Sequence, residues 1–322
     1  MAIPGWQQDD SPFHPGEKVV QAKLGVRDRM ESVGRRMIRL FLPEQHRQFY
    51  TQLPYFLVGT VDVEGNPWAS ILVGEPGFVS TPSDRTLHVA AQPLFGDPLS
   101  NNLTIDSKIG FLGIELHTRR RNRVNGVVSE ITPDGFSVAV EQTFGNCPKY
   151  IQGRQFNLHD CDIAVAKPVH AFTTLDNEKR AVIHAADTFF IATAYLNSAA
   201  DVTHGVDVSH RGGHPGFVRI DGNTLTVPDL AGNCIFNTFG NVEVNPCAGL
   251  LFIDFETGNL LYLTGRAEVI WHGDPEINLY AGAERLLKFY LNRGIHVEGS
   301  LPLSWSVPEQ SSFLDNTGPW DG

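Results

Sequence analysis

The chain contains an internal repeat, and this feature restricts its fold more than any other in the sequence. Three pairs of segments mark the repeat: Pro76–Val79 with Pro215–Val218, IGFLGIE from Ile109 with AGLLFID from Ala248, and Gly126 with Gly265. The members of each pair are separated by the same offset of 139 residues. One offset shared by three blocks predicts two copies of one supersecondary unit, with compensating insertions in the surface loops between them.

The two copies share an order of expected elements. Each begins with a helix-like segment, residues 43–53 in the first half and 176–186 in the second. Strand-like segments separated by turn residues follow: FLVGTVDV, WASILVG, TLHVAA and IGFLGIEL, then FIATAYL, VDVS, FVRIDGNTLTV, GLLFIDF and NLLYLTGRAEVIW. The turn Asp221-Gly222-Asn223 indicates a tight hairpin. About six short strands per half, without alternating helices, favour antiparallel sheet closed into a small barrel.

These patterns divide the chain into four parts. Residues 1–42 are expected to form a partly helical N-terminal arm, because KVVQAKLGVRDRMESVGRRMIRLFL has a helical pattern. Residues 43–155 form the first barrel and residues 156–298 the second, packed as an intramolecular pseudo-dimer. Residues 299–322, rich in Pro, Ser and Gly, are expected to be a loop-like tail. The predicted fold class is therefore mainly β, with two tandem barrels and flanking helices.

Composition and charge narrow the range of partners. The 322 residues carry a formal net charge of −11, which repels nucleic acid and anionic lipid at long range. No apolar run approaches the roughly 18 residues that cross a bilayer. The N-terminus also lacks the charged-then-apolar pattern of a secretory signal. We therefore expect a cytoplasmic protein that binds neither nucleic acid nor membrane.

The cysteines and histidines show no metal-binding pattern. The four cysteines are Cys147, Cys161, Cys234 and Cys247, and none forms a C-x-x-C pair. We expect them to be reduced and mostly buried. The twelve histidines show no H-E-x-x-H or similar spacing, so no metal site is predicted.

The stretch GVDVSHRGGHPGFVRI, residues 205–220, interrupts a β-rich run with Arg211-Gly212-Gly213. One interpretation is a phosphate cradle, because a guanidinium donates two parallel hydrogen bonds to phosphate. Two glycines would leave their backbone N–H groups unobstructed, as an anion-binding nest requires. The other interpretation is an ordinary hairpin loop with a solvated arginine, since the chain contains 31 glycines.

The order of blocks in the second half resembles the pyridoxamine 5'-phosphate oxidase-like FMN-binding split-barrel family. The blocks are Ala186–Phe190, GVDVSHRGGHPGFVRI, LTVPDLAGN, FNTFGNVEVNP and LTGRAEVI. The resemblance covers roughly residues 45–290, is weaker in the first half, and is best to family members of uncertain activity. It implies two tandem split barrels with FMN in the crevice between them. One barrel would bind the phosphate, and the other would reach over the flavin.

The resemblance implies a set of cofactor-binding residues in the second barrel. The set is Ser209, Arg211, Gly212, Gly213, Asn233, Asn237 and Thr238. Arg211 would bind the FMN phosphate, with a hydroxyl from Ser209 and backbone N–H groups from the two glycines. The remaining three residues lie where the family presents further polar contacts to the phosphate and the ribityl chain.

The first half lacks this cradle and carries a segment that the second half lacks. Leu72 stands at the position equivalent to Arg211, and an aliphatic side chain does not neutralise phosphate. The segment FGNCPKYIQ, residues 144–152, resembles the Phe-His-Cys-x-Lys segment that approaches the partner's flavin in related single-barrel proteins. Asn146 replaces the family histidine, but Lys149 remains, and a cation near reduced flavin favours reduction. These complementary losses predict one composite site per chain.

Two further clusters carry charge. Arg119, Arg121 and Arg123 alternate in HTRRRNRVNG, so on a strand they would share one face. They would bind an anionic substrate or a second phosphate group, or form a solvated hairpin in an acidic protein. His204, His210 and His214 lie near the expected cradle, and we expect these loop histidines to face solvent rather than a metal.

These features lead to three hypotheses of different kinds. The first is an FMN-dependent oxidoreductase that transfers hydride or electrons between a small-molecule substrate or nicotinamide donor and an acceptor, including a redox partner protein. The second is a non-catalytic flavin or haem carrier, since some split barrels bind haem. The third is a structural tandem barrel without a cofactor. No catalytic residue is identified, and the assembly is expected to be a monomeric pseudo-dimer or a homodimer.

Overall fold

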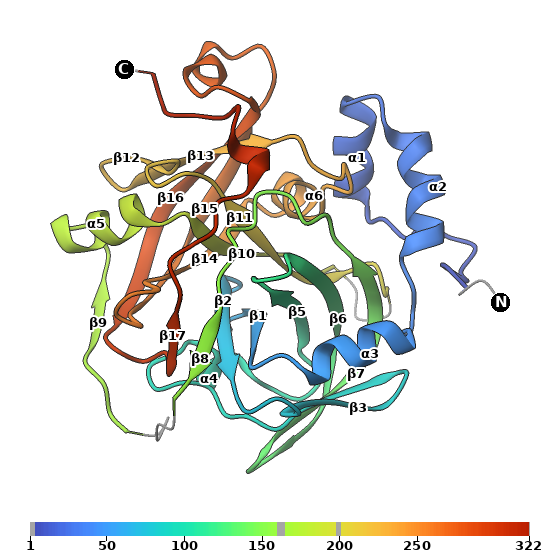
Figure 1. Cartoon of the computed structure of the whole chain (residues 1–322). Helices are drawn as coiled ribbons and strands as arrows, with labels where there is room; N and C mark the ends of the chain where they lie inside the picture. Colours follow the sequence, from blue (N-terminus) through green and yellow to red (C-terminus); the bar gives the residue numbers. More distant parts are fainter. Residues whose placement is uncertain (1–3, 160–164, 198–200, 322) are drawn as a thin grey trace.

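The structure is a computed structural model that describes residues 4–159, 165–197 and 201–321. Two antiparallel sheets dominate it and form two open, split barrels with flanking helices, which confirms the expected fold class (Figure 1). The first sheet contains β1 (Tyr55–Val61), β2 (Pro67–Val73), β3 (Val79–Ser83), β4 (Thr86–Val89), β5 (Lys108–Glu115), β6 (Arg120–Thr132) and β7 (Gly135–Gly145). The second contains β10 (Thr188–Tyr195), β11 (Gly205–Gly212), β12 (Arg219–Asp221), β13 (Thr224–Leu230), β14 (Cys247–Ile253), β15 (Leu260–Ile270) and β16 (Ala283–Val297).

The sequence repeat is a repeat of sheet topology. The strand order is β2-β1-β5-β6-β7-β4-β3 in the first sheet and β11-β10-β14-β15-β16-β13-β12 in the second. Gly126 and Gly265, one of the matched pairs, both lie at register shifts, on β6 and β15. A Cβ at Gly126 would lie 2.2 Å from the Ala139 carbonyl oxygen, and one at Gly265 would lie 2.0 Å from that of Tyr290. Glycine therefore recurs there because the bulged backbone leaves no room for a side chain.

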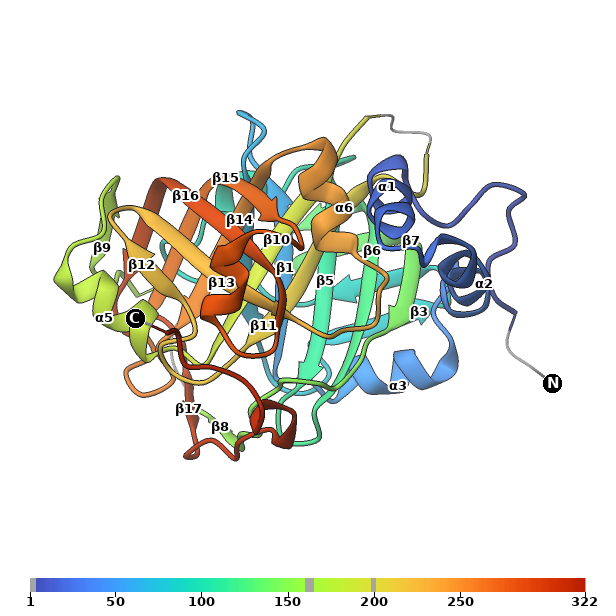
Figure 2. The same ribbon diagram turned by 90° about the horizontal axis from the view of Figure 1, so that it is seen from above.

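The two sheets pack against each other through equivalent strands. β1 lies against β10, and β2 contacts β14 as β11 contacts β5, so the contacts have the reciprocal form of an isologous dimer. Figure 2 shows the strands of the first half and those of the second half on either side of this contact. Gly110 and Gly249, equivalent by the same offset, allow the close approach. A Cβ at Gly110 would lie 2.0 Å from the Val206 oxygen, and one at Gly249 would lie 2.4 Å from the Pro67 oxygen.

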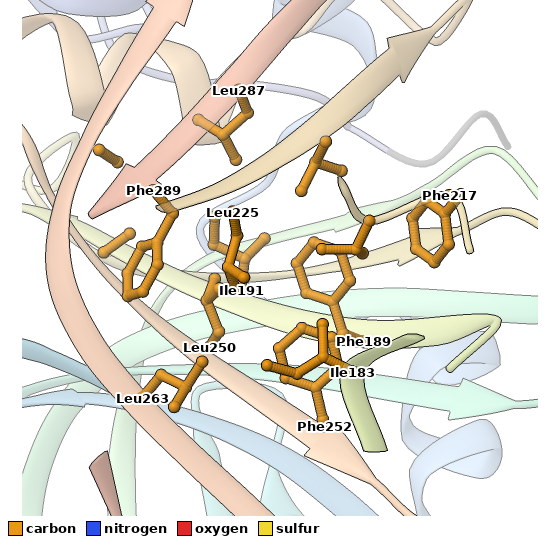
Figure 3. Packing of buried hydrophobic residues seen from close by; sticks show 14 of the residues in the cluster. Ile183, Phe189, Ile191, Phe217, Leu225, Leu250, Phe252, Leu263, Leu287 and Phe289 are labelled. Atoms are coloured by element: carbon orange, nitrogen blue, oxygen red, sulfur yellow. The ribbon is translucent and has the colours of Figure 1, made fainter. Parts of the chain in front are cut away.

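Successive side chains of a buried strand belong alternately to two hydrophobic cores. On β10, Phe189 and Ile191 point into the second barrel, whereas Phe190 and Ala192 belong to the core between the barrels. Figure 3 shows Phe189 and Ile191 within the second-barrel core, which Phe289 from β16 also joins. Because both faces are covered, these strands read as continuous apolar runs instead of a strict alternation.

Helices open each half of the repeat, and others flank the two sheets (Figure 1). They are α1 (Pro15–Lys23), α2 (Arg27–Met37), α3 (Glu44–Thr51), α4 (Leu99–Asn102), α5 (Asn177–Ala185) and α6 (Asn237–Val244), with short 3-10 helices η1 (Pro275–Leu279) and η2 (Ser312–Leu314). The two helix-like segments of the repeat are confirmed as α3 and α5, and Asp176 caps α5 by accepting a hydrogen bond from the Lys179 backbone N–H. In both views α1 lies beside α6 (Figures 1 and 2).

Short strands in the described part of the chain also lie outside the repeat. β9 (Val169–Phe172) pairs with β16, and β8 (Phe156–Leu158) pairs with β17 (Leu303–Trp305). The C-terminal tail, expected to be loop-like, therefore also contributes a strand and the helix η2 to the structure.

Two further findings concern the described residues alone. Within them, no helix is both long and apolar enough to span a membrane. Cys147, Cys234 and Cys247 are free thiols and are partly exposed instead of buried, which corrects the expectation for these three. Cys161 lies outside the described residues.

Candidate functional site

A cavity of about 120 Å³ opens where the two barrels meet. The first half contributes Arg121 and Arg123 from β6 and the segment after β7, residues 146–150. The second half contributes β11, the loop and first turn of α6, and Arg285 from β16. The structure thus brings the two halves together around one cavity, with Lys149 on one side and Ser209 and Arg211 on the other.

Arg123 and Ser209 form a polar contact between the two halves at the cavity. Arg123 donates from Nη2 to the Ser209 hydroxyl at 2.6 Å and pairs through Nη1 with Asp207 at 3.0 Å. Thr238 also donates to the Ser209 oxygen, at 3.0 Å. The Ser209 hydroxyl is thus held between Arg123 and Thr238 at the cavity wall.

The N-terminus of α6 also faces the cavity. Asn237, Thr238 and Phe239 line it, and no side chain of the described residues caps the helix. Phe236, the residue before the first turn, has a left-handed backbone with φ of 67°. Uncapped first-turn N–H groups and the positive end of the helix dipole favour an anion at this place.

Two further guanidinium groups of the cavity lining share one carboxylate. Arg211 and Arg285 bind different oxygens of Asp229, and the Arg285 Nε to Asp229 Oδ2 distance is 2.6 Å. Both cations also stack on aromatic rings, with Arg211 Cζ 4.9 Å from the Phe239 centroid and Arg285 Cζ 5.0 Å from that of Phe236. Arg211 therefore reaches the cavity as part of a fixed cluster.

The charged side chains that line the cavity are mostly cations. Among the described residues, its charged lining consists of the cations Arg121, Arg123, Lys149, Arg211 and Arg285 and the single acid Asp229. Arg121 donates to the Cys147 carbonyl oxygen at 2.7 Å and has no carboxylate partner among the described residues. Burial, together with the neighbouring guanidinium groups of Arg123 and Arg211, lowers the pKa of Arg121 to about 10. In a chain of net charge −11, such convergence indicates a site for an anion.

Buried polar atoms in the same lining lack partners. The Nε atoms of Arg123 and Arg211 and the Nε2 atom of His210 are buried without a hydrogen-bond partner among the described residues. Burial and nearby arginines hold the pKa of His210 well below its usual range, so its imidazole is neutral near pH 7. Unpaired buried donors cost free energy unless a ligand satisfies them.

The equivalent place in the first half is filled by a carboxylate of the chain itself. Asp97 accepts from the Ser70 hydroxyl at 2.6 Å, from the Tyr262 hydroxyl at 3.0 Å and from the Leu99 backbone N–H at 2.8 Å. By the 139-residue offset, these three groups correspond to Ser209, Arg123 and Thr238.

This correspondence is independently supported by a second pair of hydrogen bonds. Asn102 donates to Thr60 at 3.3 Å in the first half, and Asn241 donates to Thr193 at 3.0 Å in the second. An anion thus occupies the first-half position that, in the second half, faces the cavity.

Several predictions from the sequence need correction. Ser209–Gly212 is strand, not loop, and the Gly213 N–H donates to the Asp187 carbonyl oxygen at 3.0 Å, so the two glycines form no anion nest. Gly212 is required instead because a Cβ there would lie 2.1 Å from the Tyr150 carbonyl oxygen. Gly213 does not line the cavity.

The structure places only some members of the predicted arginine and histidine clusters at the cavity. Arg121 and Arg123 share the cavity, but Arg119 precedes β6 with φ of 58° and binds Glu309 at 2.9 Å, away from it. His204 and His210, expected to face solvent, are buried.

The remaining predicted residues lie at the cavity with other polar partners. Asn233 of the second half donates to Asn146 of the first half at 3.4 Å, and this hydrogen bond joins the two halves at the cavity. Asn237 donates to Glu17 of α1 at 2.5 Å. Lys149 lies 3.5 Å from the Ala231 carbonyl oxygen, the weakest of these contacts.

The sequence analysis did not identify Asp229, Arg285 and Asp207. The two aspartates are the carboxylates that pair with arginines of the site. The available signal was a charged residue at an inward position of an otherwise apolar strand, as in LTVPDL and AERLLKF. Such residues are rarely buried without a partner or a ligand. Identifying the partner, however, requires the pairing of distant strands.

Comparisons with known proteins give no assignment. No protein-family model and no curated protein matches the chain. Among solved structures, it is similar to a single-residue variant of HupZ from Group A Streptococcus, with 16% identity over 38% of this chain and 98% of that one, at a TM-score of 0.30. It is also similar to a FAD-binding protein from Mesorhizobium loti, with 12% identity over 40% of this chain and 97% of that one, at a TM-score of 0.26. A third similar structure is the inhibitor of motility MotI from Bacillus subtilis. It has 8% identity over 74% of this chain and 87% of that one, at a TM-score of 0.20. At these TM-scores the similarities identify no ligand.

Proposed function

We propose that the chain binds FMN between its two barrels, as a member of the pyridoxamine 5'-phosphate oxidase-like family would, and acts as an FMN-dependent oxidoreductase. The observation that carries this proposal is the carboxylate of Asp97. It accepts hydrogen bonds from Ser70, Tyr262 and Leu99, which are the repeat equivalents of Ser209, Arg123 and Thr238. The positions of Ser209, Arg123 and Thr238 therefore suit a ligand anion, here the FMN phosphate, supplemented by first-turn N–H groups of α6.

The charge and the unpaired donors fit a phosphate. Carboxylates pair with Arg123, Arg211 and Arg285, whereas Arg121 and Lys149 have no carboxylate partner among the described residues, and a dianion would offset their charge. Its oxygens would also satisfy the Nε atoms of Arg123 and Arg211. The cavity volume of about 120 Å³ is smaller than the roughly 300–1,000 Å³ of typical small-molecule sites. We infer that the phosphate end of FMN fills the cavity and that the remainder lies at its open mouth.

When bound, FMN supplies the exchange of hydride or electrons with a substrate or a nicotinamide donor. The chain's own residues bind and orient it. Lys149 would place a positive charge near the flavin, which favours the reduced, anionic form. Arg121, which has no carboxylate partner among the described residues, would bind an anionic group of the substrate.

The phosphate contact is tested with Arg211→Ala. Asp229 keeps Arg285 as a partner in this variant, so no buried carboxylate is left unpaired. We expect FMN affinity to fall by roughly ten- to a hundredfold, as for a lost charge-assisted hydrogen bond, and riboflavin affinity to change little because riboflavin has no phosphate. Flavin fluorescence titration measures both affinities.

Arg266→Ala is the matched control, because Arg266 is exposed, pairs with Glu268 and is not in the cavity lining. Equal weakening of FMN and riboflavin by Arg211→Ala would show that Arg211 does not bind the phosphate. A colourless purified protein that takes up no added FMN would refute the proposal as a whole. Oxidation of NADH or NADPH by the flavin-loaded protein would separate an enzyme from a carrier.

A non-catalytic flavin or haem carrier is the second candidate function. It is favoured by His210, which lines the cavity as a neutral imidazole with a buried Nε2 that has no partner among the described residues. Neutral imidazole is an axial ligand of haem iron, and the cations would suit haem propionates. A Soret band in the absorption spectrum that His210→Ala abolishes would establish this function in place of the first.

A further inference from the structure

We propose that helix α1 of the N-terminal arm is part of the anion site, and that Glu17 is a positioning residue for the first turn of α6. The inference rests on the proposed function, in which that turn binds the ligand's anionic group. No residue of α1, a helix that the structure describes in full, lines the cavity. The helix acts on the site through α6, against which it packs.

Two side chains of α1 hold the segment that leads into α6. Glu17 Oε1 accepts a hydrogen bond from the Asn237 side chain at 2.5 Å, and Gln21 donates to the Ile235 carbonyl oxygen at 3.0 Å. These contacts lie on either side of Phe236, whose left-handed backbone costs free energy for a residue with a side chain. The two hydrogen bonds from α1 therefore stabilise the strained segment around Phe236. That segment directs the uncapped N–H groups of α6 into the cavity.

The contact between the two helices is close and leaves little room for adjustment. A Cβ at Gly16 would lie 2.0 Å from the Gly240 carbonyl oxygen, and a Cβ at Gly240 would lie 2.6 Å from the Glu17 backbone nitrogen. The other Glu17 oxygen accepts from the His14 backbone N–H at 3.0 Å and completes a capping box. Glu17 thus links the start of α1 to the start of α6.

The electrostatic surroundings of Glu17 couple it to an anion. The groups that face it are Asp207 of β11, Arg123 of β6, Asn237 of α6 and His14 at its own helix start. Burial, and after it the Asp207 carboxylate, raise the pKa of Glu17 well above its usual range. Burial also lowers the pKa of His14 to about 4, so His14 adds no positive charge near neutral pH.

A raised pKa gives a definite sign to the pH dependence. Glu17 is neutral in the folded protein until the pH rises through its folded-state pKa, and above that pH it adds a negative charge behind the anion site. Anion affinity should therefore decline in the wild type as the pH rises through the folded-state pKa of Glu17. Glu17→Gln, which stays neutral at every pH, should lack that part of the decline, whereas the part due to Arg121, whose pKa is about 10, remains.

The test uses the full chain, with sulfate as the probe because its charge is constant over neutral and alkaline pH. Sulfate binding is measured by calorimetry and FMN binding by fluorescence. We expect Gly16→Ala, which separates α1 from α6, and Glu17→Ala each to weaken both ligands roughly tenfold, the effect of one lost hydrogen bond of about 1.5 kcal/mol. Glu17→Gln should match the wild-type affinity below the folded-state pKa of Glu17 and reduce the decline above it.

Gly205→Ala is the matched control, since a Cβ at Gly205 meets nothing within 4 Å and the affinity should not change. Wild-type sulfate affinity in folded Gly16→Ala and Glu17→Ala would overturn the inference, as would a pH profile of sulfate affinity in Glu17→Gln identical to that of the wild type. If melting curves show that Gly16→Ala does not fold, the two Glu17 variants decide alone. A wild type that binds sulfate but not FMN refutes the proposed function only, whereas one that binds neither refutes both.

Discussion

At the scale of single residues, Asp97 explains why one of the two equivalent sites is closed. Its carboxylate accepts three hydrogen bonds in the place where the second half has an open cavity. Tyr262, one of the donors, comes from the second barrel, so the closed site also joins the two halves. Leu72 in place of Arg211 fits this arrangement, because Asp97 fills the site and leaves no space for a ligand anion that an arginine would bind.

Asp97 also sets part of the pH dependence of stability. Burial raises its pKa from 3.8 to about 6, so the folded state binds the proton more tightly than the unfolded chain. This group's contribution is therefore complete below about pH 4 and declines by about 3 kcal/mol as the pH rises to about 6. Asp97→Asn should remove that decline, which denaturant unfolding of both proteins across this pH range would measure. Parallel pH profiles for wild type and variant would contradict the assignment.

At the scale of elements, β11 and the segment after β7 form the two sides of the cavity and touch at Gly212. The strand runs through Gly212, and the Tyr150 carbonyl oxygen occupies the space that a Cβ would need. The glycine therefore serves the approach of the first-half segment to the strand. Sequence reasoning placed Gly212 at the site but assigned it to phosphate binding, because a close approach between distant segments leaves no local pattern.

This difference in role leads to a distinct prediction for Gly212→Ala. The new Cβ should displace the segment that carries Lys149 and Tyr150, whereas the phosphate contacts at Ser209 and Arg123 stay in place. FMN and riboflavin should therefore weaken by a similar factor, in contrast to Arg211→Ala. Fluorescence titration of both flavins measures the ratio, and a selective loss of FMN would restore the nest interpretation.

At the scale of the whole molecule, two copies of one sheet topology face each other with reciprocal strand contacts. A symmetric contact would produce two equivalent sites, but the two halves have diverged at the residues that line them. One site is closed by Asp97, and the other gathers five cations. The expectation of one composite site remains a prediction, and binding stoichiometry measures it.

The contact between the barrels should depend on its paired glycines. Gly110→Ala and Gly249→Ala each place a Cβ against the backbone of the opposite half, 2.0 Å from Val206 and 2.4 Å from Pro67. We expect each to lower the free energy of unfolding by about 1–3 kcal/mol through overpacking, and to weaken flavin binding at the same contact. Chemical denaturation measures the change, with Gly205→Ala as the control that has open space. Unchanged stability in both variants would contradict the close packing of the halves.

The sequence by itself determined the duplicated frame. Apolar strand runs, a tight hairpin at Gly222 and bulge glycines at one offset act locally, so their repetition could be recognised without a structure. The family resemblance, and no local pattern, predicts Ser209, Arg211 and Lys149 at one site, and all three line one cavity.

Only the tertiary structure decided which charges converge and which are neutralised. Arg123 meets Asp207 and Ser209, Arg285 meets Asp229, and Glu17 meets Asn237 across 220 residues of chain. Strand pairing and sheet packing bring such residues together, and neither is encoded by spacing along the chain. The physical reason is that burial makes an unpaired charge expensive, so the identity of a site depends on partners that only the packed fold supplies.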